Sequence, residues 1–220
     1  MSVSIRYLDR QYLKRYKRIA NSVESRYAEV VTSVKTHLPY SLNVYVTPFV
    51  IEDTEKLGPR TTFRAYFNLN FYEPDDLSHR AIFTTLEFLE KFPQYIPAGF
   101  GHELAHQIAE GDRKMTKRDL ELQLRNPLQA KEEQETRKNK ALDLFPKQLQ
   151  GLIHEWDMLS SEKSTAQMLL KNAWKVPMIK FEKRVYGSKL PQLQEIILAN
   201  TKQALSSVDT YEEELQNQKS

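Results

Sequence analysis

Two histidines four residues apart are the feature of this sequence best suited to chemistry. The stretch GFGHELAHQIAEGD, residues 99–112, places His102 and His106 on either side of Glu103. On a helix, residues four apart project from one side, so both imidazoles can reach one metal ion. Glu103, rotated by about 100° from His102, can hold a water bound to that metal. The pattern predicts hydrolysis in which Glu103 accepts the water's proton and later donates it to the leaving amine.

The neighbours of the two histidines favour a buried metal helix. They are uncharged at Phe100, Leu104, Ala105, Gln107 and Ile108. Nearby charges would compete for the ion or perturb the water. The alternative is a pair of partly exposed helix histidines with Glu103 in a surface ion pair. Because the chain has no cysteine, any metal must be held by His, Asp or Glu.

The motif HELAH, residues 102–106, resembles the signature of the zincin metallopeptidases. The resemblance implies Zn²⁺ bound by His102 and His106, with Glu103 as the catalytic residue. It also implies an α+β fold with a zincin-like core, in which a small antiparallel or mixed sheet lies over the HExxH helix and a following ligand helix. Zincins bind an extended peptide on the strand before the metal helix, and TTFRAYFNLN, residues 61–70, is the candidate strand. His154 or Tyr66 is a candidate for stabilising the oxyanion.

Catalytic zinc takes three protein ligands, so the sequence must supply one more. Metzincins place it shortly after the motif, and Asp112 stands at that position. The glycine that lets the metzincin chain turn is replaced here by Ala109, and Gly111 comes two residues late. A turn through Ala109 would be strained. Asp112 is therefore the weaker alternative.

Gluzincins, which resemble thermolysin, take a glutamate from the following helix. HEWDMLSSEKSTAQMLL, residues 154–170, offers Glu155 and Glu162. Small residues follow Glu162 as in gluzincins, and Glu162 lies beside an apolar stripe that we centre on Leu152, Trp156, Leu159 and Leu170. We expect His102, His106 and Glu162 to bind zinc, with Glu155 as the other alternative on this helix. Ala166 stands where gluzincins have an acidic partner for a ligating histidine, which leaves the orientation of that ring unexplained.

Hydrophobic periodicity indicates the elements that position these residues. A long amphipathic helix is predicted from Ile5 to His37, and residues 42–51 and 61–72 are predicted to be two antiparallel strands. Residues 78–92 are predicted to be a helix, followed by the metal helix from Pro97 to Gly111 and helices over 147–173 and 191–215. The predicted organisation is an N-terminal helix packed on the core (1–40), a zincin-like domain with a charged insertion (41–175, insertion 113–147) and a C-terminal helical extension (176–220).

The net charge and the hydropathy of the chain limit the classes of partner that are expected. The 220-residue chain has a formal net charge of +3, which argues weakly against a protein built mainly to grip nucleic acid. The N-terminal segment has no apolar signal-peptide run, and no stretch approaches the roughly 20 apolar residues that cross a bilayer. We therefore expect a cytoplasmic protein without a membrane partner. The basic, tyrosine-containing run around Arg15, Lys17 and Arg18 is interpreted as a solvated helix face rather than a nucleic-acid surface.

The predicted function is a zinc-dependent metallopeptidase of gluzincin type acting on a peptide or protein substrate. The charged segment 113–147 would border the cleft as a lid, an inhibitory plug or a cleavage site. One alternative is a zincin-like module that binds zinc without catalysis and serves in binding or regulation. Another is a nucleic-acid-binding helical protein that uses the basic N-terminal helix.

Overall fold

The structure is a computed structural model that describes residues 3–7, 10, 13–38, 42–47, 69–110, 116–160, 175–199, 202–203 and 206. Its strands are β1 (Val3–Tyr7), β2 (Leu42–Thr47), β3 (Leu69–Tyr72) and β4 (Arg80–Thr85). Its α-helices are α1 (Leu13–Tyr16), α2 (Ala20–Val34), α4 (Leu86–Lys91), α5 (Ile96–Glu110), α6 (Lys117–Arg125), α7 (Pro127–Leu142), α8 (Lys147–Ser160) and α10 (Lys175–Tyr186). Short 3-10 helices lie at η2 (Lys35–His37), η4 (Pro93–Tyr95) and η5 (Gly187–Lys189), and residues 190–199 form a further helix.

The four described strands form one mixed sheet in the order β1-β2-β4-β3. β2 runs parallel to β1 and to β4, with Val44 opposite Ile5 on one side and Ile82 on the other. β3 runs antiparallel to β4 and places Asn70 opposite Ile82. Among the described strands, β3 therefore lies at one edge of the sheet.

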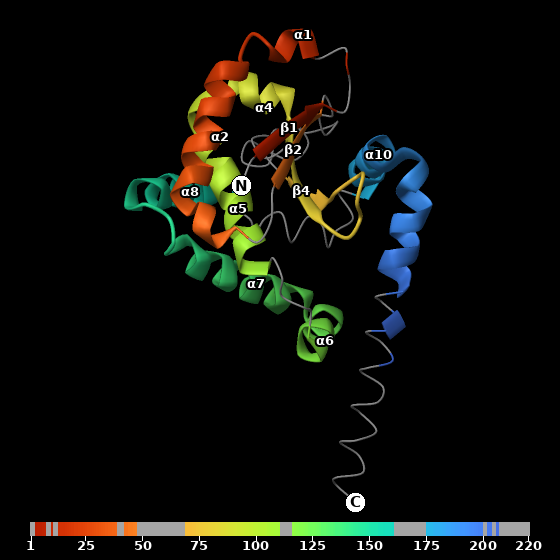
Figure 1. The fold of residues 1–220 in the computed structure, drawn as a ribbon. Helices are drawn as coiled ribbons and strands as arrows, with labels where there is room; N and C mark the ends of the chain where they lie inside the picture. The colour runs from red at the N-terminus through yellow and green to blue at the C-terminus, as the bar shows by residue number, and fades with distance from the viewer. Residues whose placement is uncertain are drawn as a thin grey trace, which may run out of the picture.

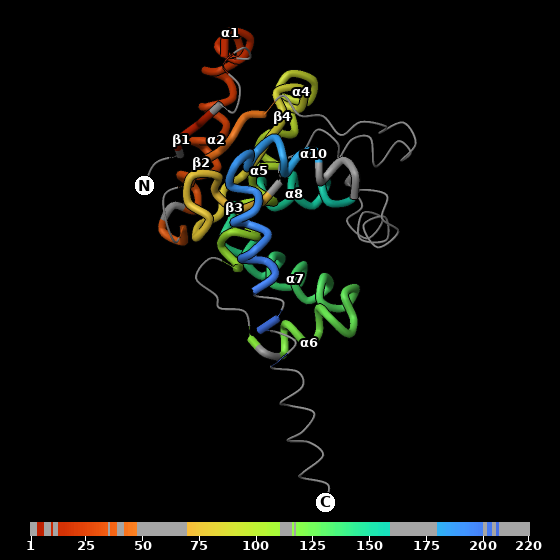
Figure 2. Tube along the Cα trace, turned by 90° about the vertical axis from the view of Figure 1, so that its right-hand side faces the viewer, coloured from red at the N-terminus to blue at the C-terminus, as the bar shows by residue number. Residues whose placement is uncertain are grey.

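Helices cover both faces of this sheet (Figure 1). Val44, Val46 and Ile82 are buried in the core shared with α2, α5 and α8. Their neighbours Tyr45 and Phe83 are buried on the other face in a second cluster with α10, as expected from the two-residue repeat of a strand. Figure 2 shows α10 in front of the strands on that side. The architecture is a three-layer α+β arrangement that is mostly helical.

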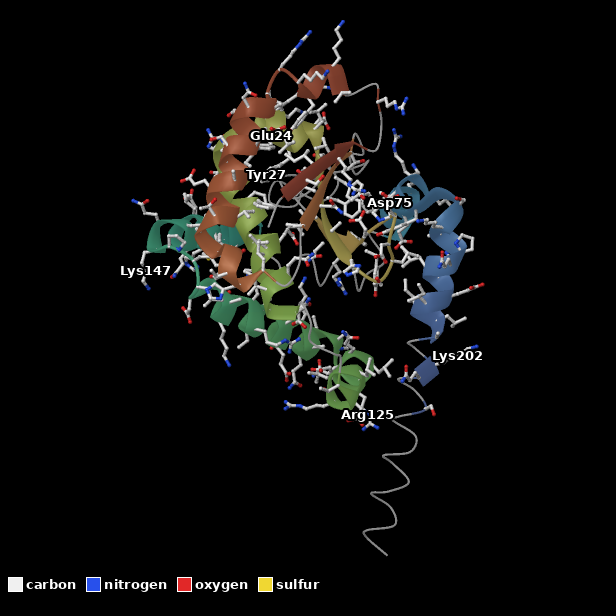
Figure 3. The ribbon with its side chains drawn as sticks, in the orientation of Figure 1. Glu24, Tyr27, Asp75, Arg125, Lys147 and Lys202 are labelled. Atoms are coloured by element: carbon white, nitrogen blue, oxygen red, sulfur yellow. The ribbon has the colours of Figure 1, made fainter. Side chains whose placement is uncertain are left out.

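Close packing fixes α5 between the sheet, α2 and α8. The ring of Tyr27, which Figure 3 labels on α2, meets the ring of Phe100 edge-on with centroids 4.3 Å apart. A Cβ added at Gly101 would lie 2.8 Å from Ile153 Cδ1, so the glycine allows α8 to approach. At Gly99 the added Cβ would lie 3.3 Å from the Trp156 ring. The helix that carries the histidines is thus held on several sides.

The predicted helix from Ile5 is wrong in its first part. Residues Val3–Tyr7 form β1, and the long helix α2 begins only at Ala20. Pairing with β2 overrides the helical period in this short stretch. The predicted apolar face of the second part is confirmed, because Val23, Tyr27, Val30, Val31 and Val34 are buried.

The basic residues of this N-terminal region are partly tied to the body of the protein. Arg6 donates to Asp75 Oδ2 at 2.8 Å, and Arg15 forms a bidentate ion pair with Glu90. Lys17 and Arg18 are exposed. These partly exposed ion pairs agree with the solvated face that the sequence predicted for Arg15.

Two predictions for the sheet region also need correction. In the described residues β2 is flanked by β1 and β4, and the antiparallel partner of β3 is β4, not β2. Residues 48–68 lie outside the description.

The predicted helix over 78–92 is a strand, β4, followed by the short helix α4. Because β4 is covered on both faces, Ala81 to Thr85 are all buried and show no strand-like alternation.

The C-terminal region begins with α10 and continues through η5 into the helix over 190–199. Phe181, Val185 and Leu193 pack in the second core cluster, so this part completes the sheet's cover. Residues 207–220, which include the end of the predicted helix 191–215, are not described. None of the helices in the described ranges is long and apolar enough to cross a membrane.

Candidate metal centre

The three residues of the predicted motif lie on α5, which spans Ile96–Glu110 and confirms the predicted helix. His102 and Glu103 are buried, with exposed fractions of 2% and 5%, and the His106 side chain is 12% exposed. The imidazole centroids of His102 and His106 are 4.9 Å apart. The two rings therefore share one side of the helix, as the spacing predicted.

Asp157 on α8 orients the first histidine. Its Oδ1 lies 2.6 Å from His102 Nδ1. Because a carboxylate only accepts, Nδ1 carries the proton in this pair and the lone pair of Nε2 is left for a metal. Burial raises the pKa of Asp157, but the hydrogen bond from His102 and the charges of His102 and Lys138 bring it below its ordinary value. Asp157 thus supplies the acidic partner that the sequence seemed to lack at Ala166.

Glu135 on α7 faces the second histidine. Its Oε1 lies 3.5 Å from His106 Nε2. Two atoms bound tetrahedrally to zinc at ordinary bond lengths are separated by about 3.3 Å, close to this distance. A nitrogen and a carboxylate oxygen are thus already spaced as neighbouring zinc ligands would be.

Lys138, one helical turn after Glu135, places an ammonium between the two acids. Its Nζ lies 2.8 Å from Glu135 Oε2, 2.7 Å from Asp157 Oδ2 and 3.4 Å from His102 Nδ1. The side chain is 1% exposed. Burial lowers the pKa of Lys138, but the charges of Asp157 and Glu135 and the hydrogen bonds to them raise it above its ordinary value. Lys138 is therefore a buried cation within this cluster.

In the part of the chain that the structure describes, no three His, Asp or Glu side chains have the arrangement of a metal site. The chemistry of the donors nevertheless fits zinc, since two imidazoles and one carboxylate are a common catalytic ligand set. The orientation of His102 by Asp157 fits as well. What differs is Glu135, whose second oxygen pairs with the Lys138 ammonium.

The other candidate ligands and the oxyanion residues are placed only in part. Glu162, Asp112 and Tyr66 lie outside the described residues. Glu155 and His154 are described and exposed, which argues against Glu155 as a ligand in a buried site.

The apolar stripe predicted for α8 is rotated about the helix axis from the observed stripe. Leu149, Ile153 and Trp156 are buried, whereas Leu152 is 40% exposed. The predicted stripe was centred on residues spread from Leu152 to Leu170, whereas α8 ends at Ser160 and the residues from 161 to 174 lie outside the description. The observed stripe brings Asp157, next to Trp156, to the edge of the core.

The charged insertion predicted over 113–147 is mostly helical where it is described, but part of it packs in the core instead of lying outside it. α6 and α7 are helices, and α7 packs along α5 (Figure 1). Lys138, Ala141 and Phe145 are buried in it at steps of three and four. That spacing is visible in the sequence and could have marked one side of α7 as buried, but the surrounding charges favoured a solvated helix.

The edge strand β3 is tied to the same helix. Gln107 Nε2, one residue after His106, donates to Asn70 Oδ1 on β3 at 2.6 Å. Gln107 is buried and Asn70 is half-buried. The described end of the predicted substrate strand therefore lies beside α5, while residues 61–68 are outside the description.

Neither a protein-family model, nor a curated protein, nor a solved structure matches this chain. The assignment of the site must therefore be argued from its own side chains.

Proposed function

We propose that this protein is a zinc-dependent metallopeptidase in which His102, His106 and Glu135 bind the ion. The observation that carries the proposal is the pairing of both histidines with carboxylates, one of which orients His102 while the other lies beside His106 at the spacing of neighbouring zinc ligands. Asp157 holds Nδ1 of His102 at 2.6 Å, and Glu135 Oε1 lies 3.5 Å from Nε2 of His106. A surface pair of histidines would need neither contact nor burial.

Each residue of the proposed site has a separate role in catalysis. Asp157 fixes the tautomer and ring orientation of His102. Zinc, when bound, lowers the pKa of a water and polarises the peptide carbonyl. Glu103, adjacent to His102 and buried, accepts the proton of the attacking water and donates it to the leaving amine. The low exposure of α5 keeps bulk water from competing in these steps.

The substrate class is proposed to be an extended peptide. β3 has a single neighbour, β4, among the described strands, and we propose that the peptide pairs as a strand with the other edge of β3. The bond between Gln107 and Asn70 couples that edge to the helix of His106. A peptide bound along β3 would run past α5, which favours a peptidase over hydrolysis of a small compact substrate.

The ligand set is tested by measuring zinc content in purified wild type and in His106→Ala, Glu135→Gln and Glu162→Gln variants. We expect about one zinc per chain in wild type, and its loss in His106→Ala and Glu135→Gln. Glu132→Gln is the matched control, because Glu132 is an exposed acid on the same helix. Loss of zinc in Glu162→Gln instead of Glu135→Gln would move the third ligand to Glu162. A wild-type protein that binds no zinc would refute the proposal.

A further inference from the structure

Lys138 is unexpected in a centre proposed for a doubly charged ion. Its ammonium is buried and lies within 2.8 Å of an oxygen of Glu135 and 2.7 Å of an oxygen of Asp157. It also lies 3.4 Å from Nδ1 of His102. One lysine thus contacts the proposed third ligand and the residue that orients the first.

The position of the ammonium relative to the two histidines defines its role. It lies near Nδ1 of His102, while the atom left for a metal is Nε2 of that ring. On Glu135 it holds Oε2, while Oε1 faces His106. Lys138 therefore contacts the ring nitrogen of His102 and the oxygen of Glu135 that are not the proposed ligand atoms, so the ammonium and a metal would share Glu135.

The positive charge of Lys138 determines how its contact with Glu135 affects metal binding. With neutral histidines, Glu103, Glu135 and Asp157 together carry a charge of about −3, and Lys138 reduces it to about −2, so the metal-free centre attracts a doubly charged ion less strongly with the lysine than without it. The ammonium also repels the ion directly across a low-dielectric interior. Without metal the ammonium has the opposite effect, because it pairs with both Glu135 and Asp157 and offsets part of the repulsion between these partly buried acids.

We infer that Lys138 sets the zinc affinity of this centre by competing with the ion for Glu135 and by stabilising the metal-free state. The inference rests on the proposed zinc function. It makes Lys138 a positioning residue that weakens metal binding, whereas a partner such as Asp157 strengthens it. The centre would then exchange its metal more readily than the same ligands without an adjacent cation.

The experiment measures zinc affinity by competition with a chromophoric chelator at one fixed pH. Lys138→Met removes the charge, and Lys138→Gln removes it while keeping a hydrogen-bond donor for the carboxylates. We expect both variants to bind zinc at least about tenfold more tightly than wild type. Lys138→Arg keeps the charge and is expected to stay within about threefold of wild type. Lys140→Met, an exposed lysine two residues away, is the matched control and should not change the affinity.

Zinc affinity that is unchanged or weaker in both neutral variants would overturn the inference. If a variant folds only with zinc, the zinc dependence of its unfolding midpoint reports the same affinity. Failure of the zinc proposal itself looks different, since wild type and His106→Ala would then bind zinc equally poorly. Binding that depends on His106 but not on the charge at position 138 would leave the metal centre in place and remove only the role of Lys138.

Discussion

α5 and α7 pack against each other but differ in character. α5 has the sequence IPAGFGHELAHQIAE, in which the two acids and two histidines stand against an apolar background. α7 has the sequence PLQAKEEQETRKNKAL, in which charged residues dominate. Both helices bring groups to one buried cluster. In α5 the functional candidates can be recognised by type and spacing, and in α7 they are hidden among residues of the same types.

The difference shows that a functional charge in a charged helix is distinguished by its partners rather than by its own type. Glu135 and Lys138 differ from exposed Glu132 and Lys140 only in what surrounds them. Lys138 is tolerated inside because Asp157, from a third helix, and Glu135 both pair with it. Nothing within α7 records that Asp157 will be there.

The largest effect is expected for a substitution on α5, which should change the rate of peptide hydrolysis. Glu103→Gln removes the proposed proton acceptor and should lower the rate of peptide hydrolysis by about 10²–10⁴-fold or more, with zinc content unchanged. The measurement is cleavage of a fluorogenic peptide library beside zinc analysis. Glu110→Gln, at the end of the same helix, is the control and should keep the wild-type rate.

Equal rates in Glu103→Gln and wild type would exclude Glu103 as the base. If wild type binds zinc through His106 but shows no hydrolysis that depends on Glu103, the protein is the zincin-like binding or regulatory module of the alternative hypothesis. Either result would leave the contacts of the buried cluster unchanged and would remove only the catalytic role proposed for Glu103 on α5.

The next effect comes from α7. In the metal-free protein, Lys138→Met leaves the partly buried carboxylates of Glu135 and Asp157 without their cation and should lower the free energy of unfolding by about 3 kcal/mol, the lower end for a buried pair, because solvent screens the two acids in part. Zinc should restore part of this loss in the variant, because it supplies positive charge at the same carboxylate. Urea unfolding with and without zinc measures both. A loss below about 1 kcal/mol would mean that the cluster contributes little to holding α7 on α5.

The parts of the structure that the sequence predicted are those whose signal is local. α5 and the apolar face of α2 follow from spacing within one helix, and both are confirmed. β4 was missed because its cover on both faces leaves no alternating pattern, whereas β1, VSIRY, does alternate and was missed because this short stretch was joined to the helical period that follows it.

The same reasoning separates the members of the candidate site. His102, Glu103 and His106 could be identified because they form one motif on one helix. Asp157, Glu135 and Lys138 could not, because their roles arise where three helices meet. Glu162 was favoured by a resemblance in local sequence, and it stays a prediction because it lies outside the described residues.

A smaller effect tests how α8 brings Asp157 to α5. Gly101→Ala places a Cβ 2.8 Å from Ile153 Cδ1, so the isoleucine must move, whereas a Cβ at Gly151 on α8 meets nothing within 4 Å. Both changes gain helix propensity, so their difference isolates the contact. We expect Gly101→Ala to be less stable than Gly151→Ala by about 1–3 kcal/mol in urea unfolding. Equal free energies of unfolding for the two variants would show that α8 can move away from α5 without loss of stability.

The smallest effect concerns the rim of the contact between α5 and α7. Arg137 Nε donates to Glu110 Oε1 at 2.6 Å, but both side chains are about one quarter exposed, at 27% and 26%. Solvent and salt screen such a pair, so a double-mutant cycle with Glu110→Gln and Arg137→Gln should give a coupling of about 0.2–1 kcal/mol that falls at high salt. A coupling above about 2 kcal/mol that resists salt would contradict this. It would mean that the rim pair, and not the buried cluster of Glu135, Lys138 and Asp157, holds the charged helix against the apolar one.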